Sequence, residues 1–374
     1  MASQKAIANE IGRAVQVAAR NGKGWYNPHM AAAAHAVVER IPMVDLILDV
    51  RDARIPFSSE NHQLRNYHHR ARRIVVMNKM DLASRTHSQG WARYFEQQNC
   101  FSYGVNSHNK ESVKGLLNFL QAQIRDLKRS GHSSYTTTVM LAGVPNVGKS
   151  ALANSLHQIG RISAAEKGRL KHATVSPQPG ETKNISSLKI ASHPNIYVLD
   201  TPGILPPEIH DVEVCSKLTL TGAIKDCLVG ERVLACYFLS ILGSGDEYKK
   251  WARFSTYEDE RSLEDQKAEF TSASDSDVKR KRQYRTDHTQ DFIVQEVRRT
   301  LFETISTYNG NPENELDLKE LIKIQFTSLR EAFQVPAELG DDDAHGKVAA
   351  KLLNLYRTGR LGHYTLDPLP MSSL

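Results

Sequence analysis

The sequence has few cysteines and no long apolar run. Its four cysteines form no CxxC pair, so neither a zinc site nor a disulfide framework is indicated, and we expect reduced thiols. No apolar stretch approaches the ~20 residues that a membrane-spanning helix needs, and no secretory signal pattern opens the chain. These shortages exclude a disulfide-stapled secreted domain and a helical membrane protein, and they favour a soluble protein.

Length and composition set wider bounds. A chain of 374 residues with 40% hydrophobic content can bury the cores of two domains. The formal net charge of +6 favours a polyanionic partner, although solubility alone would account for it equally well. The motifs must therefore decide the function.

Gly143-Val-Pro-Asn-Val-Gly-Lys-Ser150 matches the pattern of a phosphate-binding loop. Its glycines leave backbone N–H groups free to converge on phosphate oxygens at the start of a helix. We expect Lys149 to reach the outer phosphates and Ser150 to hold magnesium. The context agrees, because residues 136–142 are typical of a buried strand and residues 151–156 open a helix.

Asp200-Thr-Pro-Gly203 follows a second apolar strand, predicted over residues 195–199. This motif supplies a carboxylate for the magnesium shell, and the Gly203 N–H would face the terminal phosphate. Pro179-Gly-Glu-Thr182 lies between the two phosphate motifs. There the Thr182 hydroxyl could close over magnesium and the terminal phosphate.

Asn78-Lys-Met-Asp81 follows an apolar strand predicted over residues 73–77, and it has the pattern of a guanine-reading loop. The Asp81 carboxylate can accept two N–H bonds from guanine, which adenine cannot offer. Asn78 would brace the loop and the base, and the Lys79 stem would cover the ring. Ser102-Tyr-Gly-Val-Asn-Ser107 ends a further strand and could back the base through main-chain N–H groups; a plain strand-end turn is the alternative.

The base-reading motif precedes the phosphate loop, which inverts the usual order and indicates a circularly permuted GTPase. Every ligand loop of a doubly wound sheet lies at the carboxyl edge, so permutation preserves the site. The predicted fold class is therefore α/β, a P-loop GTPase with a mostly parallel sheet, followed by a smaller α-helical domain. The predicted parts are an N-terminal basic amphipathic extension (1–24), the GTPase domain (25–206) and a helical domain (207–374) with a mobile charged insert (243–290). Helices are predicted over 211–221, 231–242, 291–308, 316–333 and 347–357.

With these motifs the chain resembles the YlqF/RbgA-type circularly permuted GTPases, most closely the mitochondrial DAR GTPases of plants. The motifs that carry the resemblance are, in order, Trp25-Tyr-Asn-Pro-His-Met30, Asp52-Ala-Arg-Ile-Pro56, Asn78-Lys-Met-Asp81, Asn106-Ser107, the phosphate loop, Pro179-Gly-Glu-Thr182, Asp200-Thr-Pro-Gly-Ile204 and Leu355-Tyr-Arg-Thr-Gly-Arg-Leu-Gly362. The resemblance implies a GTPase that binds the large ribosomal subunit and its rRNA, couples hydrolysis to late maturation, and then leaves.

The resemblance also implies a set of site residues. Contacts with GTP are expected from Asn78, Lys79, Asp81, Asn106, Ser107, Pro145, Asn146, Val147, Gly148, Lys149, Ser150, Ala151, Thr182 and Gly203. Magnesium is expected at Ser150, Thr182 and Asp200, and potassium at Asn146, which could otherwise only stabilise its loop. The expected catalytic residues are His29, Lys149, Thr182 and Gly203.

Hydrolysis is expected to be slow, because Ile204 stands where many GTPases place the glutamine that orients water. The family suggests His29 as the replacement, although Asn27-Pro28 here replaces the Pro-Gly that precedes that histidine. Stimulation by potassium and by the ribosomal subunit is expected. The alternative function is a GTP-binding RNA or ribosome scaffold with negligible turnover.

Further expectations concern surroundings and partners. Residues 1–24 are compatible with a mitochondrial presequence or with an ordinary N-terminal helix, and the resemblance favours the presequence. The resemblance also implies a location in the mitochondrial matrix, in association with the inner-membrane face. Cytoplasm or plastid is the alternative location. We expect a monomer. Asp52-Ala-Arg54 could form an ion-paired turn or contact a switch segment or RNA. The last helix could present Lys347, Lys351, Arg357 and Arg360 to rRNA phosphates, with Tyr356, His363 and Tyr364 as stacking surfaces, or form a solvated basic face.

Overall fold

The chain folds into two compact units. The computed structural model describes residues 2–21, 24–26, 28–62, 64, 72–129, 135–163, 185–254, 288–336 and 338–370. The first unit, termed the sheet unit, comprises residues 11–229 and 363–374, and the second, termed the helical unit, comprises residues 1–10 and 230–362. The expected boundary at 206/207 thus falls inside the sheet unit, and the last residues of the chain also belong to that unit.

A six-stranded sheet in the order β3-β2-β1-β4-β6-β5 forms the centre of the sheet unit. All neighbouring strands are parallel except β5 and β6, which pair antiparallel. The strands are β1 Leu46–Asp52, β2 Arg72–Asn78, β3 Phe101–Gly104, β4 Thr136–Ala142, β5 Ser186–Ser192 and β6 Asn195–Asp200. Because β1 is covered on both faces, all its residues are buried, and its charged residues Asp49, Arg51 and Asp52 form ion pairs. The predicted α/β class is confirmed.

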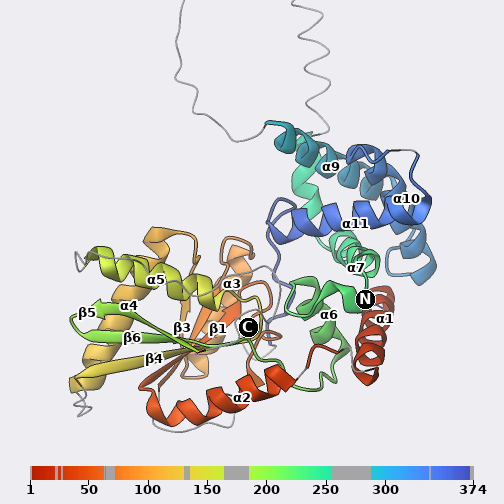
Figure 1. The fold of residues 1–374 in the computed structure, drawn as a ribbon. Coiled ribbons are helices and arrows are strands. Elements are labelled where there is room, and N and C mark those ends of the chain that lie inside the picture. The colour runs from red at the N-terminus through yellow and green to blue at the C-terminus, as the bar shows by residue number, and fades with distance from the viewer. Residues whose placement is uncertain are drawn as a thin grey trace, which may run out of the picture. The chain divides into compact units, whose positions relative to one another are not determined.

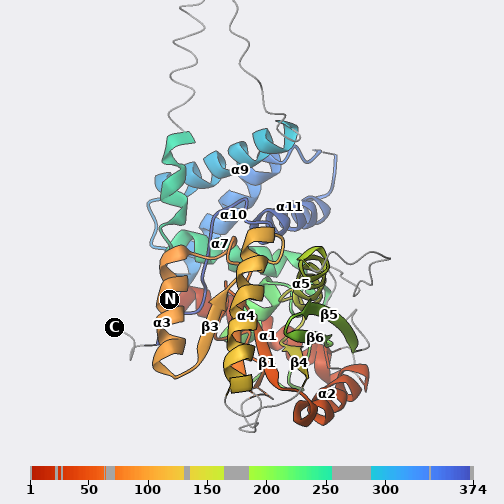
Figure 2. The ribbon, with the colours of Figure 1, turned by 90° about the vertical axis from the view of Figure 1, so that its left-hand side faces the viewer.

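Helices cover both faces of this sheet. Figure 1 shows α5 above the strands and α2 below them, and Figure 2 shows α3 and α4 in front of the strands. The helices are α2 Pro28–Arg40, α3 Arg85–Gln97, α4 Lys110–Arg129, α5 Lys149–Ser163 and α6 Val212–Leu220, with short 3-10 turns at Ile41–Met43 and Asp226–Leu228. Val37 of α2 packs with Ile47 of β1 and Met140 of β4 in one buried apolar cluster. This is the doubly wound arrangement that the motif order requires.

The N-terminal segment folds as α1, Ala2–Arg20. Its apolar face is buried, with Ile11 0% and Val15 1% exposed. Gly12 lies so close to α6 that a Cβ there would stand 2.7 Å from Cγ1 of Val212. Of the two readings of residues 1–24, the packing therefore favours an integral N-terminal helix.

The helical unit consists of α7 Glu231–Ser244, the 3-10 segment η4 Glu247–Phe254, α9 His288–Thr307, α10 Glu315–Ala332 and α11 Asp341–Arg357. Its core includes Phe238 and Tyr356, whose ring centroids are 4.6 Å apart. Helix α11 begins earlier than predicted, since three acidic residues, Asp341–Asp343, occupy its first turn and complement the helix dipole. Among the described residues, none of the helices is both long and apolar enough to span a bilayer.

Two predictions for this unit need correction. The charged insert does not start at residue 243, because α7 and η4 extend to Phe254 and Trp251 is buried; residues 255–287 lie outside the described residues. The stacking surfaces proposed for rRNA are also wrong in part, because Tyr356 and Tyr364 are only 1% and 7% exposed. Of the predicted phosphate-binding lysines, Lys347 is exposed. Lys351 is also exposed, and its amine donates a hydrogen bond to the Phe333 carbonyl at 3.0 Å.

Candidate nucleotide site

The phosphate loop connects β4 to the first turn of α5, as its sequence predicts. Close packing explains its two glycines. A Cβ on Gly143 would lie 2.3 Å from the Val50 carbonyl oxygen, and one on Gly148 would lie 2.3 Å from Nδ2 of Asn78. The loop is therefore pressed against the ends of β1 and β2, and its N–H groups lie at a helix N-terminus, where anions are favoured.

Lys149 is buried, and its ammonium group donates to the carbonyls of Gly143 and Val144 at 3.1 and 2.8 Å. Burial lowers the pKa of Lys149 to about 8; the charge of Asp200 opposes this shift, and the charge of Lys79 adds to it. The lysine thus folds back onto its own loop. Phosphate oxygens could take the place of these two carbonyls and would favour the protonated form of Lys149.

Asp200 ends β6 beside this loop and is fully buried. Neither of its carboxylate oxygens has a hydrogen-bond partner among the described residues. Burial raises the pKa of Asp200, while the Ser150 hydroxyl, Lys149 and the Thr201 N–H lower it to a smaller extent. A buried carboxylate with so little compensation is costly, and a hydrated divalent cation is the group that would satisfy it. The residues present therefore fit magnesium.

Gly203 approaches the phosphate loop so closely that a Cβ would stand 2.5 Å from Cα of Pro145. The following N–H, of Ile204, donates to the Gly143 carbonyl at 3.3 Å. The Ile204 side chain is 2% exposed and packs with Val37, Ile47 and other residues beneath the sheet. This side chain serves the core, so it cannot orient a water molecule at a terminal phosphate.

Asn78, at the end of β2, joins the base-reading motif to two other loops. Its Nδ2 donates to the Val147 carbonyl at 2.8 Å, and its Oδ1 accepts the N–H of Ser107 at 3.1 Å. The Ser107 carbonyl in turn accepts a hydrogen bond from Ser155 of α5 at 2.7 Å. Asn106 accepts the His108 N–H at 2.9 Å. The three loops that were predicted to meet are thus connected by hydrogen bonds.

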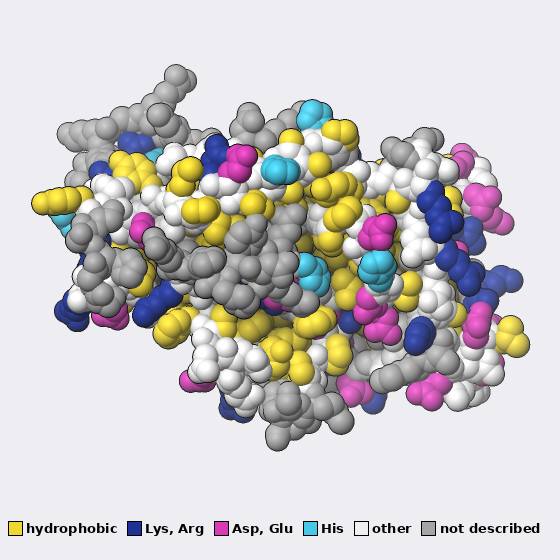
Figure 3. All heavy atoms as spheres, turned by 90° about the horizontal axis from the view of Figure 1, so that it is seen from below, with side chains coloured by type: hydrophobic (Ala, Val, Ile, Leu, Met, Phe, Trp, Pro, Cys, Tyr) yellow, Lys and Arg dark blue, Asp and Glu magenta, His cyan; other side chains and the backbone are white. Residues whose placement is uncertain are grey.

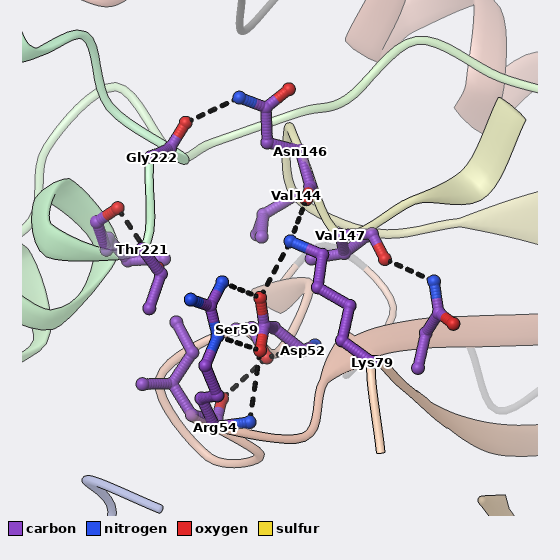
Figure 4. Close-up of polar contacts among 12 residues, drawn as sticks. Asp52, Arg54, Ser59, Lys79, Val144, Asn146, Val147, Thr221 and Gly222 are labelled. Atoms are coloured by element: carbon purple, nitrogen blue, oxygen red, sulfur yellow. Dashed lines mark hydrogen bonds and ion pairs between the residues drawn. The ribbon is translucent and has the colours of Figure 1, made fainter. Parts of the chain in front are cut away.

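Lys79 makes a second connection, which Figure 4 shows. Its ammonium group donates to the Asn146 carbonyl at 2.5 Å and to Oδ2 of Asp52 at 2.9 Å. Asp52 also accepts two hydrogen bonds from the Arg54 guanidinium, at 3.0 and 2.8 Å. Burial alone would raise the pKa of Asp52, but the charges of Arg54 and Lys79 outweigh it and hold this pKa well below its ordinary value.

Asp52 is a site residue whose role the sequence reasoning missed. Of its two readings, the ion-paired turn is present, since Asp52 and Arg54 pair within the loop. The pairing with Lys79 was not foreseen. The pairing follows from the strand order, because β1 and β2 are parallel neighbours in which Asp52 lies opposite Asn78, one residue before Lys79.

The remaining predicted residues are less closely connected. Asp81 is exposed on its loop, where a base could reach it. His29 is exposed on the first turn of α2, and no hydrogen bond or ion pair joins it to another described residue. The Asn146 amide donates to the Gly222 carbonyl at 2.8 Å. Thr182 lies outside the described residues, and the remaining predicted contact, Ala151, lies in the first turn of α5.

Comparison with known proteins agrees with this geometry. The profile of the family described as 50S ribosome-binding GTPase matches residues 138–233. The chain is 59% identical to DAR GTPase 2, mitochondrial, of Arabidopsis thaliana, covering 96% of this chain and 95% of that one. It is 32% identical to Ribosome biogenesis GTPase A of Bacillus pumilus, covering 58% of this chain and 74% of that one. The chain therefore belongs to the family of circularly permuted GTPases that includes the DAR GTPases and Ribosome biogenesis GTPase A.

Proposed function

We propose that this GTPase is an assembly factor that binds the large mitochondrial ribosomal subunit and couples GTP hydrolysis to late maturation and to its own release. The main support is the hydrogen-bonded junction of the base-reading and phosphate loops through Asn78 and Lys79. Relatives of this chain are named as ribosome biogenesis and mitochondrial ribosome-associated GTPases. The mitochondrial location likewise rests on the names of relatives.

Magnesium is proposed to bind at Ser150 and Asp200, with Thr182 as a further ligand. The support is the buried Asp200 carboxylate, which lacks donors among the described residues. When bound, the ion would neutralise phosphate charge. Lys149 would exchange the Gly143 and Val144 carbonyls for phosphate oxygens, and the Gly203 N–H would face the terminal phosphate.

Slow intrinsic hydrolysis is proposed because Ile204 is committed to the core. The missing assistance would come from a potassium ion at Asn146, from His29, and from the ribosomal subunit. Since the Asn146 amide N–H donates to Gly222, the ion would be bound through the amide oxygen. His29 is exposed, so a partner surface or a change at α2 would have to bring it to the attacking water.

Single-turnover hydrolysis in potassium and in sodium, each with and without purified large subunits, tests this function. We expect the fastest reaction with both potassium and subunits. If neither accelerates it, the alternative of a GTP-binding scaffold with negligible turnover replaces the catalytic proposal. Ile204 is the residue that favours that alternative.

The role of His29 is tested by His29→Ala, with His35→Ala as the matched control because His35 is exposed on the same helix. We expect His29→Ala to slow subunit-stimulated hydrolysis by roughly 10²–10⁴-fold, the usual contribution of a positioned acid–base group, while GTP affinity is retained. Wild-type turnover in this variant would remove His29 from the mechanism.

Partner and compartment are tested together by fractionating cells that contain the tagged protein and then sedimenting the mitochondrial lysate. We expect cosedimentation with large subunits in the presence of a non-hydrolysable GTP analogue and release with GDP. Recovery in the plastid or cytoplasmic fraction, or sedimentation that ignores the nucleotide, would contradict the proposal.

A further inference from the structure

The last described residues of the chain, 363–370, pack on the sheet unit; we name them the strap. The Tyr364 N–H donates to the Leu82 carbonyl at 3.1 Å, and the Leu366 N–H donates to the Arg54 carbonyl at 2.7 Å. Between them, the Thr365 hydroxyl accepts the Ser84 N–H at 3.3 Å. The strap is therefore bonded both to the loop that continues from the base-reading motif and to the loop that follows β1.

Asp367 fixes the strap in place. It is 2% exposed, so its charge would be costly without partners. Its Oδ2 accepts the N–H groups of Phe57 and Ser58, both at 2.8 Å. Its Oδ1 accepts the Ser58 hydroxyl at 2.7 Å and the Lys217 ammonium at 3.1 Å. The carboxylate thus joins the strap to the β1 loop and to α6.

These contacts bear on the base-reading loop. The loop that follows β1 contains Arg54, which donates hydrogen bonds to Asp52, and the Asp52 carboxylate binds Lys79. Leu82 directly follows Asp81 of the base-reading motif. The strap therefore supports this motif from two sides. One side is direct, through Leu82 and Ser84, and the other passes through the β1 loop and Asp52.

We propose that Asp367 is a positioning residue of the guanine-nucleotide site, because it holds the strap that keeps residues 79–84 in the conformation that receives the base. The proposal rests on the guanine site described above. The hydrogen bonds named above lead from the strap to Leu82, Ser84 and the loop that follows β1, so its loss acts on base recognition more than on triphosphate binding.

The test compares the affinities for GTP and for inosine triphosphate, which lacks the exocyclic amine that Asp81 would bind. Asp367→Ala should lower GTP affinity by roughly tenfold, the loss of one charge-assisted anchor, and lower inosine triphosphate affinity less, because inosine offers Asp81 only one N–H group. The preference for GTP over inosine triphosphate should therefore shrink. His363→Ala, an exposed position in the same strap, is the matched control and should keep the wild-type preference.

A wild-type preference in folded Asp367→Ala protein overturns the proposal. If the wild-type protein itself shows no preference for GTP, the proposed guanine site is contradicted instead. The test therefore distinguishes an error about the guanine site from an error about the role of Asp367. If the Asp367→Ala protein does not fold, amide hydrogen exchange on the wild-type protein tests whether the strap and residues 79–84 are coupled. GDP should increase the protection of the Tyr364 and Leu366 amides together with that of residues 79–84, and protection of the loop without the strap would contradict the coupling.

Discussion

At the residue scale, the ends of β1 and β2 explain how a base loop and a phosphate loop form one site. Asp52 and Asn78 lie side by side in register at these ends. Asn78 bonds to the Val147 carbonyl, and Lys79 links Asp52 to the Asn146 carbonyl. A shift of either loop would break the buried Asn78 hydrogen bond and the charge-assisted Lys79 hydrogen bonds, so the two loops are expected to move together.

Lys149 leads to a prediction about pH. Its pKa is lowered to about 8 by burial, so in the nucleotide-free protein it loses its proton as pH rises through that value. Phosphate charge favours the protonated form and raises this pKa, so binding should take up a proton above about pH 8 and little at neutral pH. Calorimetry of magnesium-GTP binding in buffers of different ionisation enthalpy measures the uptake. Equal uptake at both pH values would contradict this picture.

Asp81→Asn tests the base-reading role. The substitution replaces an acceptor of two N–H bonds with a group that offers a donor, so we expect roughly hundredfold weaker GTP binding and a gain for xanthosine triphosphate. Asp126→Asn is the control, since Asp126 is an exposed carboxylate on α4. Competition binding measures both nucleotides, and unchanged GTP affinity in Asp81→Asn would remove this residue from base recognition.

At the element scale, the structure shows what local pattern predicts and what it does not. Strand β4 has the predicted bounds, and the helices from α6 to α10 lie within a few residues of theirs, because apolar periodicity is a local signal. The strap could not be predicted, because Asp367 bonds to Phe57 and Ser58 about 300 residues away through backbone N–H groups that carry no sequence signature. The Lys79 pairing with Asp52 similarly needs the strand order, which local pattern does not supply.

Helix α1 provides a test at this scale. Ile11 is fully buried, so Ile11→Ala should lower the free energy of unfolding by about 2–5 kcal/mol through lost burial and a residual cavity. Val17→Ala, at a position 55% exposed on the same helix, should change it little. Denaturant titration of the two variants measures the difference. Equal stabilities would indicate that α1 is dispensable, as a cleaved presequence would be.

At the scale of the whole molecule, charge is distributed unevenly over the described surface. In the view from below, basic side chains gather near the right-hand end of the described surface, where acidic side chains lie among them, and they are sparser elsewhere on that face (Figure 3). The net charge of +6 therefore does not by itself identify an rRNA-binding face.

Subunit binding should nevertheless weaken as salt rises, because contacts between Lys or Arg and phosphates release counterions. We expect the logarithm of the association constant to fall linearly with the logarithm of the potassium concentration, with a slope set by the number of phosphates contacted. Titration at fixed GTP-analogue concentration measures it. Salt-insensitive binding would instead point to an interface made by ribosomal proteins.

The return of residues 363–370 to the sheet unit also affects how the protein is made. Residues 230–362 are synthesised between the two parts of that unit. During translation, a chain that folds from its N-terminus can pair all the strands of the sheet early, yet the buried acceptor for the Phe57 and Ser58 N–H groups leaves the ribosome only after residues 230–362. The nascent protein therefore carries an incompletely braced nucleotide pocket until the strap has been synthesised.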